Sequence, residues 1–300
     1  MERKKAGGME ANHPEGKYRV IALDMDGTVL NDEKKIDERT QRAIHRALAA
    51  GKEVVFCSGR SYAEMEDILK DYPDMNYLCG ESGALVYDLK KKRPVSMVSV
   101  SAEAVEKIKK AVQGRDVMLH IISEGRALVN RAQLPHLDYY QMGVYQEMFN
   151  RVSTVAEDVF ELIEREKCSV EKINLFHHSP EARRQSLELL ERMEVPATMV
   201  FSEIASLECS PLGLNKAVGL QTLCKELGIT MEQVIMVGDA DNDLAAMEAA
   251  GLAVAMGNAN ERILAAGHVQ VADNNHSGCA EAIERFLLEG QNEDHSTDSQ

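Results

Sequence analysis

Short apolar runs alternate with helix-like stretches in the N-terminal part of the chain. The runs have the length of strands and are apolar at nearly every position, at 19–23, 53–57 and 77–79. Between them, Asp37 is placed to cap a helix that Gly51 closes, and Ser61 with Glu64 is placed to form a capping box. Strands without a polar face, linked by helices, indicate a parallel sheet covered on both sides.

The same alternation returns in the C-terminal part of the chain. Helix-like and strand-like stretches follow one another at 217–227, 234–237, 243–250, 252–256 and 281–288. The two parts together predict an α/β core with a Rossmann-like, doubly wound parallel sheet. We expect this core at residues 17–85 and 211–290, and flexible tails at 1–16 and 291–300, where the sequence is polar.

The middle of the chain has a different pattern. Two strand-like runs at 85–88 and 94–100 predict a hairpin with an exposed basic tip. Further strands are expected at 117–122, 127–130, 172–177, 197–201 and 206–209. Helices are expected from Ser101, at 155–166 and at 179–193. This order is typical of an antiparallel α+β domain, so we expect residues 86–210 to form a second domain inserted into the core.

Composition and charge narrow the classes of partner. The formal net charge of −15 argues against nucleic acid or an anionic membrane surface as the partner. No run of apolar residues is long enough to predict a membrane span, and the first residues lack the apolar segment of a secretory signal. None of the six cysteines forms a Cys-x-x-Cys pair, which favours reduced thiols and a cytoplasmic protein.

Acidic residues stand where predicted core strands end. The segment VIALDMDGTVL, residues 20–30, places Asp24 and Asp26 directly after the first strand. Asp239, with Asn242 and Asp243 close behind, follows a strand more than 200 residues later. In open parallel sheets, ligands bind at the carboxyl ends of the strands. Carboxylates gathered there need a cation among them, and an all-oxygen set without thiolate or imidazole favours Mg²⁺.

Two further segments point to a phosphate beside this metal. Ser58 and Gly59 follow the second strand, where a hydroxyl and backbone N–H groups can bind an anion, and Lys216 precedes a predicted helix. Each signal by itself is weak, because most Asp-x-Asp pairs and most lysines are solvated surface residues. Their combination, each at a strand end or a helix start, strongly favours a functional site.

These segments resemble the motifs of the haloacid dehalogenase superfamily, and their surroundings resemble its Cof-type subfamily IIB phosphatases. The matching segments are LDMDGTVLN, GKEVVFCSGR, ESGA, GLNKA, GDADND and AVAMGNA. The resemblance covers the predicted core and implies a large inserted α+β cap of the C2 type. Within the cap it extends only to position and element order. Ser82 and Ala217 depart from the pattern, because Asn and Gly are common there in the family.

The resemblance implies a mechanism with an aspartyl-phosphate intermediate. Asp24 would be the nucleophile. Asp26 would be the general acid and base, with a pKa raised relative to that of Asp24. Mg²⁺ would be held by Asp24, the backbone carbonyl of Asp26 and Asp239, with Asp243 bound through water or orienting the ligands.

The resemblance also implies how the phosphate is held. Ser58, Gly59 and Asn242 would bind the phosphoryl group, and Lys216 would neutralise charge between it and the nucleophile. The expected function is Mg²⁺-dependent hydrolysis of small phosphorylated metabolites, such as sugar phosphates or phosphorylated cofactors. Phosphoryl transfer to a second substrate is the alternative on the same site. A phosphorylated regulatory module is less favoured, because it explains neither Asp26 nor the insertion.

The predicted cap offers few signals about the substrate. Polar side chains lie on or beside its predicted strands at Arg126, Arg131, His136, Lys172, Asn174, His177 and His178. Each of them is more often a solvated or structural residue than a ligand. Lys172 and Asn174 alternate with apolar neighbours and therefore share one face of a strand, which the sequence does not orient. Adjacent strand residues point to opposite faces, so His177 and His178 are a poor candidate for a metal site.

Overall fold

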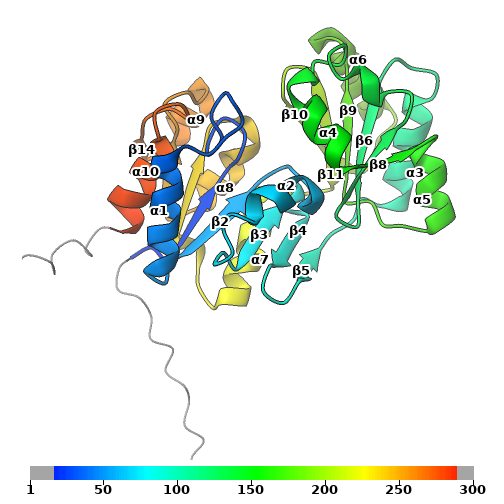
Figure 1. Ribbon diagram of the computed structural model, residues 1–300. Helices are drawn as coiled ribbons and strands as arrows, with labels where there is room; N and C mark the ends of the chain where they lie inside the picture. Colours follow the sequence, from blue (N-terminus) through cyan, green and yellow to red (C-terminus); the bar gives the residue numbers. More distant parts are fainter. Residues whose placement is uncertain (1–16, 289–300) are drawn as a thin grey trace, which may run out of the picture.

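The computed structural model describes residues 17–288, which form two sheets with their own helices (Figure 1). The tails expected at 1–16 and 291–300 lie outside the described residues, as do residues 289 and 290. The chain leaves the first sheet after β4 (Leu85–Asp88) and β5 (Arg93–Met97), builds the second sheet, and returns to the first through α7 (Lys216–Leu227). The expected α/β core with an inserted cap is confirmed.

The core sheet has eight strands. In order across the sheet they are β14 (Val269–Gln270), β13 (Leu252–Ala255), β12 (Val234–Gly238), β1 (Val20–Leu23), β2 (Glu53–Cys57), β3 (Tyr77–Gly80), β4 (Leu85–Asp88) and β5 (Arg93–Met97). The strands from β14 to β3 pair in parallel, and β4 and β5 are antiparallel. The central strand β1 is buried at every position, which explains its apolar sequence.

Helices and short 3₁₀ or π turns cover this sheet. They are α1 (Glu38–Ala49), α2 (Tyr62–Leu69), η1 (Glu81–Gly83), α7 (Lys216–Leu227), η4 (Met231–Gln233), η5 (Asp241–Asp243), α8 (Leu244–Ala249), α9 (Glu261–Ala266), α10 (Gly278–Ala282) and η6 (Ile283–Leu287). Helix α1 packs against α10 from the far end of the sequence, and α7 packs against α8 (Figure 1). The Asp37 cap and the Ser61–Glu64 capping box are confirmed.

The cap has a six-stranded sheet. Its order is β10 (Ala197–Ser202), β11 (Ser206–Pro211), β9 (Lys172–Phe176), β6 (Met118–Ser123), β7 (Arg126–Asn130) and β8 (Ser153–Ala156). Its helices are α3 (Ala102–Val112), η2 (Leu134–His136), η3 (Gly143–Tyr145), α4 (Gln146–Val152), α5 (Val159–Glu166) and α6 (Pro180–Arg192). Helices α3, α5 and α6 share one apolar cluster with the strands. A second cluster joins the segment from η2 to α4 to β6 and β9.

Several expectations were wrong in detail. The predicted hairpin forms, but β4 pairs with β3, so residues 86–97 extend the core sheet instead of opening the cap. Pairing between β7 and β8 is parallel, so the cap is not wholly antiparallel. Val155 lies in β8 instead of a helix, and α4, α9 and β14 were not predicted. These elements are short, and their placement depends on contacts with distant residues, which local periodicity does not show.

Candidate active site

The carboxyl ends of β1 and β12 bring two distant acids together. The strands pair in parallel with Leu23 beside Val237, and the Asp24 N–H donates to the Val237 carbonyl at 3.1 Å. Asp24 and Asp239 therefore follow neighbouring strands at the same edge of the sheet. This juxtaposition is the one that the sequence predicted from topology.

A tight turn after β1 joins these two acids more closely. Gly27 has φ +83°, and a Cβ at this position would collide with the Asp239 carboxylate. The next residue, Thr28, donates its hydroxyl to Asp239 Oδ1 at 2.7 Å. Glycine is therefore required at position 27 both for its left-handed backbone and for the close approach.

Lys216 lies behind Asp24 at the start of α7, where Asn215 caps the helix. Its ammonium donates to Asp243 Oδ1 at 2.6 Å and also to Asp24. The other oxygen of Asp243 accepts the N–H groups of Asp239 and Ala240, at 3.1 and 3.2 Å. Asp243 thus fixes both the lysine and the loop that carries Asp239.

The charges in this cluster are unbalanced. Oxygens of Asp24, Asp239 and Asp243 lie within 4.8 Å of one another, and Lys216 is the cation among them. Burial and the neighbouring Asp243 raise the pKa of Asp24 well above its ordinary value, against the opposite effect of Lys216. Burial likewise raises the pKa of Asp239 to about 6. An all-oxygen set with excess negative charge suits a hard divalent cation, so these residues could hold a metal ion.

The expected phosphate-binding residues lie beside this cluster. Asp24, Asp26, Ser58, Gly59, Asp239 and Asn242 line one cavity of about 400 Å³. Ser58 Oγ accepts the N–H of Arg60 at 3.1 Å. The side-chain oxygen of Asn242 is buried without a hydrogen-bond partner among the described residues, which suits a site that a ligand completes. Lys216 and Asp243 do not line the cavity and act from behind Asp24.

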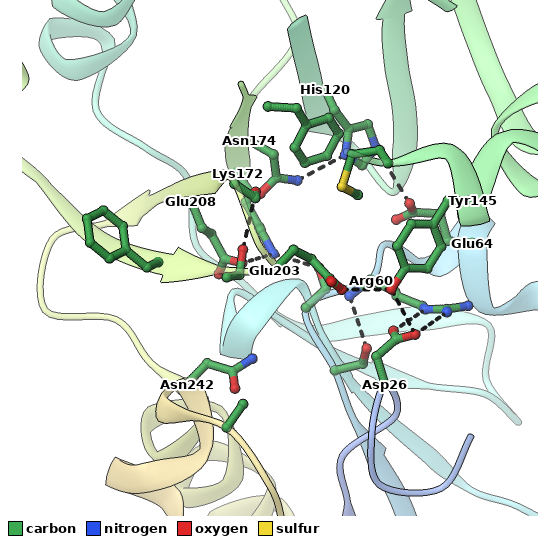
Figure 2. Close-up of a pocket in the computed structure, with 18 of the residues that line it drawn as sticks. Asp26, Arg60, Glu64, His120, Tyr145, Lys172, Asn174, Glu203, Glu208 and Asn242 are labelled. Carbon is green, nitrogen blue, oxygen red and sulfur yellow. Dashed lines mark hydrogen bonds and ion pairs between the residues drawn. The ribbon is translucent and has the colours of Figure 1, made fainter. Parts of the chain in front are cut away.

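Two basic side chains bind Asp26, and Figure 2 shows one of them, Arg60. The sequence position of Asp26 did not reveal these partners. Arg60 donates to both oxygens of Asp26 at 2.8 Å, and Lys34 donates to Oδ1 at 2.9 Å. The Tyr145 hydroxyl lies 3.2 Å from Oδ1 and 2.7 Å from Glu203 Oε1, so its one hydrogen serves either acceptor. Burial alone would raise the pKa of Asp26, but Arg60 and Lys34 outweigh it and lower this pKa well below its ordinary value. The expectation that Asp26 has a higher pKa than Asp24 is therefore wrong for this arrangement.

Two cap strands complete the wall of the cavity above Gly59. Lys172 on β9 pairs with Glu208 on β11 at 2.6 Å and donates to the Gly59 carbonyl at 2.8 Å and to Ser82 Oγ at 3.2 Å. Ser82 in turn donates to Glu208. These side chains are almost wholly buried. The face of β9 that carries Lys172 and Asn174 thus looks into the cavity, and Ser82 joins the cap to the core.

The other polar cap residues named from the sequence have structural roles or lie outside the cavity. Arg126 pairs with Glu166, and Arg131 pairs with Glu157, both at exposed positions. The His177 ring is buried between the Ala205 carbonyl and Ser186. His120 and Tyr145 do line the cavity, but sequence analysis did not single them out. Tyr145 lies in a segment where no element was predicted.

Comparisons with known proteins identify a family of hydrolases. A family model described as haloacid dehalogenase-like hydrolase matches residues 21–283. A Bacillus subtilis protein, 5-amino-6-(5-phospho-D-ribitylamino)uracil phosphatase YcsE, is 27% identical over 280 residues, covering 90% of this chain and 96% of that protein. An HMP-PP phosphatase of Yersinia pseudotuberculosis is 27% identical over 245 residues, covering 81% and 85%.

A solved structure has a similar fold. The crystal structure of a haloacid dehalogenase-like hydrolase from Bacteroides thetaiotaomicron matches with a TM-score of 0.78 and 26% identity, covering 90% of this chain and 99% of that one. Among residues 17–288, no helix is both long and apolar enough to cross a membrane.

Proposed function

Because this chain belongs to the haloacid dehalogenase-like hydrolases, we propose that it is a Mg²⁺-dependent phosphatase of small phosphorylated metabolites, such as sugar phosphates or phosphorylated cofactors. The observation that carries the proposal is the position of Asp24. Its buried carboxylate lies at the floor of a cavity, bonded to Lys216 and close to Asp239 and Asp243. The names of the two phosphatases that this chain resembles agree with it.

In the proposed first step, a carboxylate oxygen of Asp24 attacks the phosphorus of the substrate. The bond between phosphorus and the ester oxygen breaks, and its electron pair leaves with the alcohol, which takes a proton from Asp26. Water then attacks the phosphorus of the aspartyl-phosphate, its proton returns to Asp26, and Asp24 and inorganic phosphate are released. Lys216 screens the charge of the nucleophile against that of the phosphoryl group.

The metal ion would be held by Asp24 and Asp239, with the backbone carbonyl of Asp26. Asp243 would orient this set, because Lys216 and two backbone N–H groups already occupy its oxygens. When bound, the cation neutralises the negative charge that builds up on the phosphoryl oxygens. Ser58, Gly59 and Asn242 would position the phosphoryl group beside it.

Asp26 has to exchange partners to act as an acid. In the described arrangement both of its oxygens accept hydrogen bonds from Arg60, so the carboxylate is stabilised without a proton. A leaving-group oxygen that enters the cavity would have to displace at least one of these donors. We therefore propose that substrate binding frees Asp26 from part of this network.

The location and the partners follow the sequence-based expectations. We propose a cytoplasmic enzyme, because all six cysteines are free thiols and five of them are buried. The proposed partner is a small phosphorylated metabolite, not a nucleic acid or a membrane, in line with the net charge of −15.

The proposal is tested by phosphate release from a panel of phosphorylated metabolites, with Mg²⁺ and with a chelator. We expect Mg²⁺-dependent release by the wild type and none by Asp24→Asn. Asp239→Asn should need much more Mg²⁺ for the same rate. Asp74→Asn, at an exposed position, is the matched control and should behave as the wild type.

Two results would contradict parts of this proposal. Near-normal turnover by a folded Asp24→Asn variant would remove Asp24 as the nucleophile. Absence of release from every ester, with Mg²⁺ still bound, would favour phosphoryl transfer to a second substrate or a regulatory role.

A further inference from the structure

The cap contributes apolar and aromatic side chains to the lining of the cavity. They are Met142, Met148, Phe149, Phe176 and Phe201. His120 contacts the rings of Phe149 and Phe176, and Figure 2 shows that His120 and Asn174 lie at the opposite end of the cavity from Asp26 and Asn242. A phosphoryl group bound at Asp24 would therefore direct its leaving group toward this apolar end.

Three rings form one wall of the apolar end. The His120 ring lies 4.9 Å from that of Phe149 and 5.7 Å from that of Phe176, nearly parallel to the latter at 25°. Phe149 and Phe176 meet edge to face at 6.1 Å. The rings are packed into the cap, with Phe149 2% and Phe176 4% exposed, so each presents only a small part of its surface to the cavity. A flat unsaturated ring gains more from packing against these aromatic side chains than a polyol of the same size.

One hydrogen-bond acceptor is fixed beside these rings. The Asn174 amide group donates to His120 Nδ1 at 2.9 Å, so this nitrogen accepts and the His120 proton is on Nε2. Burial lowers the pKa of His120, which keeps the ring neutral, although Glu64 lies 3.6 Å from Nε2. No donor among residues 17–288 bonds the Asn174 side-chain oxygen. Asn174 thus presents an oriented acceptor that suits an N–H or O–H donor of the ligand.

The charges around the cavity disfavour a second anionic group. Apart from Asp24 and Asp239, its charged lining consists of the acids Asp26, Glu64, Glu203, Glu208 and Asp241 and the bases Arg60 and Lys172. Both bases are already paired, Arg60 with Asp26 and Lys172 with Glu208. The Glu203 carboxylate accepts a hydrogen bond from the Tyr145 hydroxyl, and Arg183 donates to the backbone carbonyl of Glu203. No basic side chain among the described residues pairs with this carboxylate. Lys34 and Arg262, which lie outside the lining, also pair with Asp26 and Asp241. A further phosphate or carboxylate on the leaving group would be repelled where it approaches the Glu203 carboxylate.

We propose that the preferred substrates are monophosphate esters of uncharged alcohols that carry a flat unsaturated ring with a hydrogen-bond donor. Phe149 and Phe176 bind the ring, and Asn174, oriented by His120, accepts the donor. The acids of the cavity, Glu203 among them, select against a second anionic group. This inference rests on the proposed phosphatase activity and specifies its substrate class.

Three matched esters test it: 3-aminobenzyl phosphate, 3-carboxybenzyl phosphate and glucose 6-phosphate. The first two share the ring and the leaving alcohol and differ in charge. The third has an uncharged but saturated leaving group. We expect kcat/KM for the amino ester to exceed that for each of the others by at least about tenfold, since like charges and missing ring contacts both weaken binding.

Substitutions assign the preference to residues. Glu203→Gln should lower the ratio of kcat/KM for the amino ester to kcat/KM for the carboxy ester. Phe149→Leu keeps an apolar side chain. It should lower the ratio of kcat/KM for the amino ester to kcat/KM for glucose 6-phosphate. A fourth ester, unsubstituted benzyl phosphate, lacks the hydrogen-bond donor. Asn174→Ala should lower the ratio of kcat/KM for 3-aminobenzyl phosphate to kcat/KM for benzyl phosphate. Each ratio is measured within one variant, so a general loss of activity or folding does not move it.

The outcomes separate this inference from the function on which it rests. If phosphate is released from all esters, and kcat/KM for the carboxy ester or for glucose 6-phosphate equals that for the amino ester, the inference is overturned. The proposed phosphatase activity is then unaffected. Ratios that the three substitutions leave unchanged would also overturn the inference. Absence of release from every ester would overturn the phosphatase, and the inference with it.

Discussion

Lys216 and Asp243 form a wholly buried ion pair, with Nζ 2.6 Å from Oδ1. The same ammonium bonds Asp24, so one cation serves two of the three clustered carboxylates. Burial lowers the pKa of Lys216, but Asp24 and Asp243 outweigh this effect and raise it well above its ordinary value. The lysine therefore stays charged at neutral pH.

Lys216→Met should lower both stability and activity, because it leaves buried carboxylates without their cation. Loss of one partner of a buried pair costs about 3–5 kcal/mol. Thermal unfolding with and without Mg²⁺ measures this, and Mg²⁺ should restore part of the lost stability. Lys225→Met, at an exposed position of the same helix, is the control. A Lys216→Met protein as stable as the control would contradict the role of the lysine.

Arg60→Met should raise the pKa of Asp26, because Arg60 supplies two of the hydrogen bonds that stabilise its charged form. A step that needs protonated Asp26 becomes faster as the pH falls through this pKa. The acidic rise in rate should therefore occur at a higher pH in the variant than in the wild type. The measurement is the single-turnover rate with an alkyl phosphate, whose leaving group needs a proton.

Para-nitrophenyl phosphate provides the control for this prediction, since its leaving group departs without protonation. Its pH profile should change little on Arg60→Met. Arg42→Met, on the exposed side of α1, controls for loss of an arginine as such. An unchanged profile with the alkyl ester would show that Arg60 does not govern Asp26.

Lys172 and Glu208 should be strongly coupled, because their ion pair is buried at the junction of cap and core. Lys172→Met and Glu208→Gln should each destabilise the protein, at about 3–5 kcal/mol for loss of one partner. The double variant should lose clearly less than the sum. Chemical denaturation of the four proteins gives the coupling energy.

The exposed pair Arg42–Glu38 is the reference for this cycle, with its atoms 3.4 Å apart on one face of α1. Its coupling should be about 0.3–0.5 kcal/mol. A coupling of that size at Lys172 and Glu208 would mean that the junction does not depend on their pairing.

Glu81 should make the protein less stable as the pH rises. It is wholly buried in η1, and its carboxyl oxygens have no hydrogen-bond partner among the described residues. Burial, with Glu171 nearby, raises its pKa to about 8. The unfolded chain releases this proton near its ordinary pKa of 4.5, whereas the folded protein keeps it to about 8. Between these values stability falls with rising pH, and it levels off above them.

Glu81→Gln tests this sign, because glutamine imitates the protonated acid and does not titrate. The unfolding temperatures of the wild type and the variant should be nearly equal near pH 4. The variant should be increasingly the more stable one up to about pH 8. Parallel stability curves over this range would show that Glu81 is ionised in the folded protein.

The sequence by itself determined the core and the floor of the site. Alternating apolar runs and capping residues specify β1, β2, α1 and α2, because periodicity and capping are local properties. The rule that ligands bind at the carboxyl ends of parallel strands then brought Asp24 and Asp239 together across more than 200 residues. Both steps used only local patterns and a general rule of topology, without knowledge of contacts between distant residues.

Only the tertiary structure decided the surroundings of Asp26 and the wall that the cap contributes. Arg60 stood in a quoted motif, but its bond to Asp26 depends on how two loops meet, and Tyr145 reaches Asp26 from a segment without a regular pattern. The alternation of polar and apolar residues predicted that Lys172 and Asn174 share one face of β9. It did not predict that this face points into the cavity. Orientation of one sheet against another depends on side-chain packing between distant segments, and no periodicity in the chain encodes it.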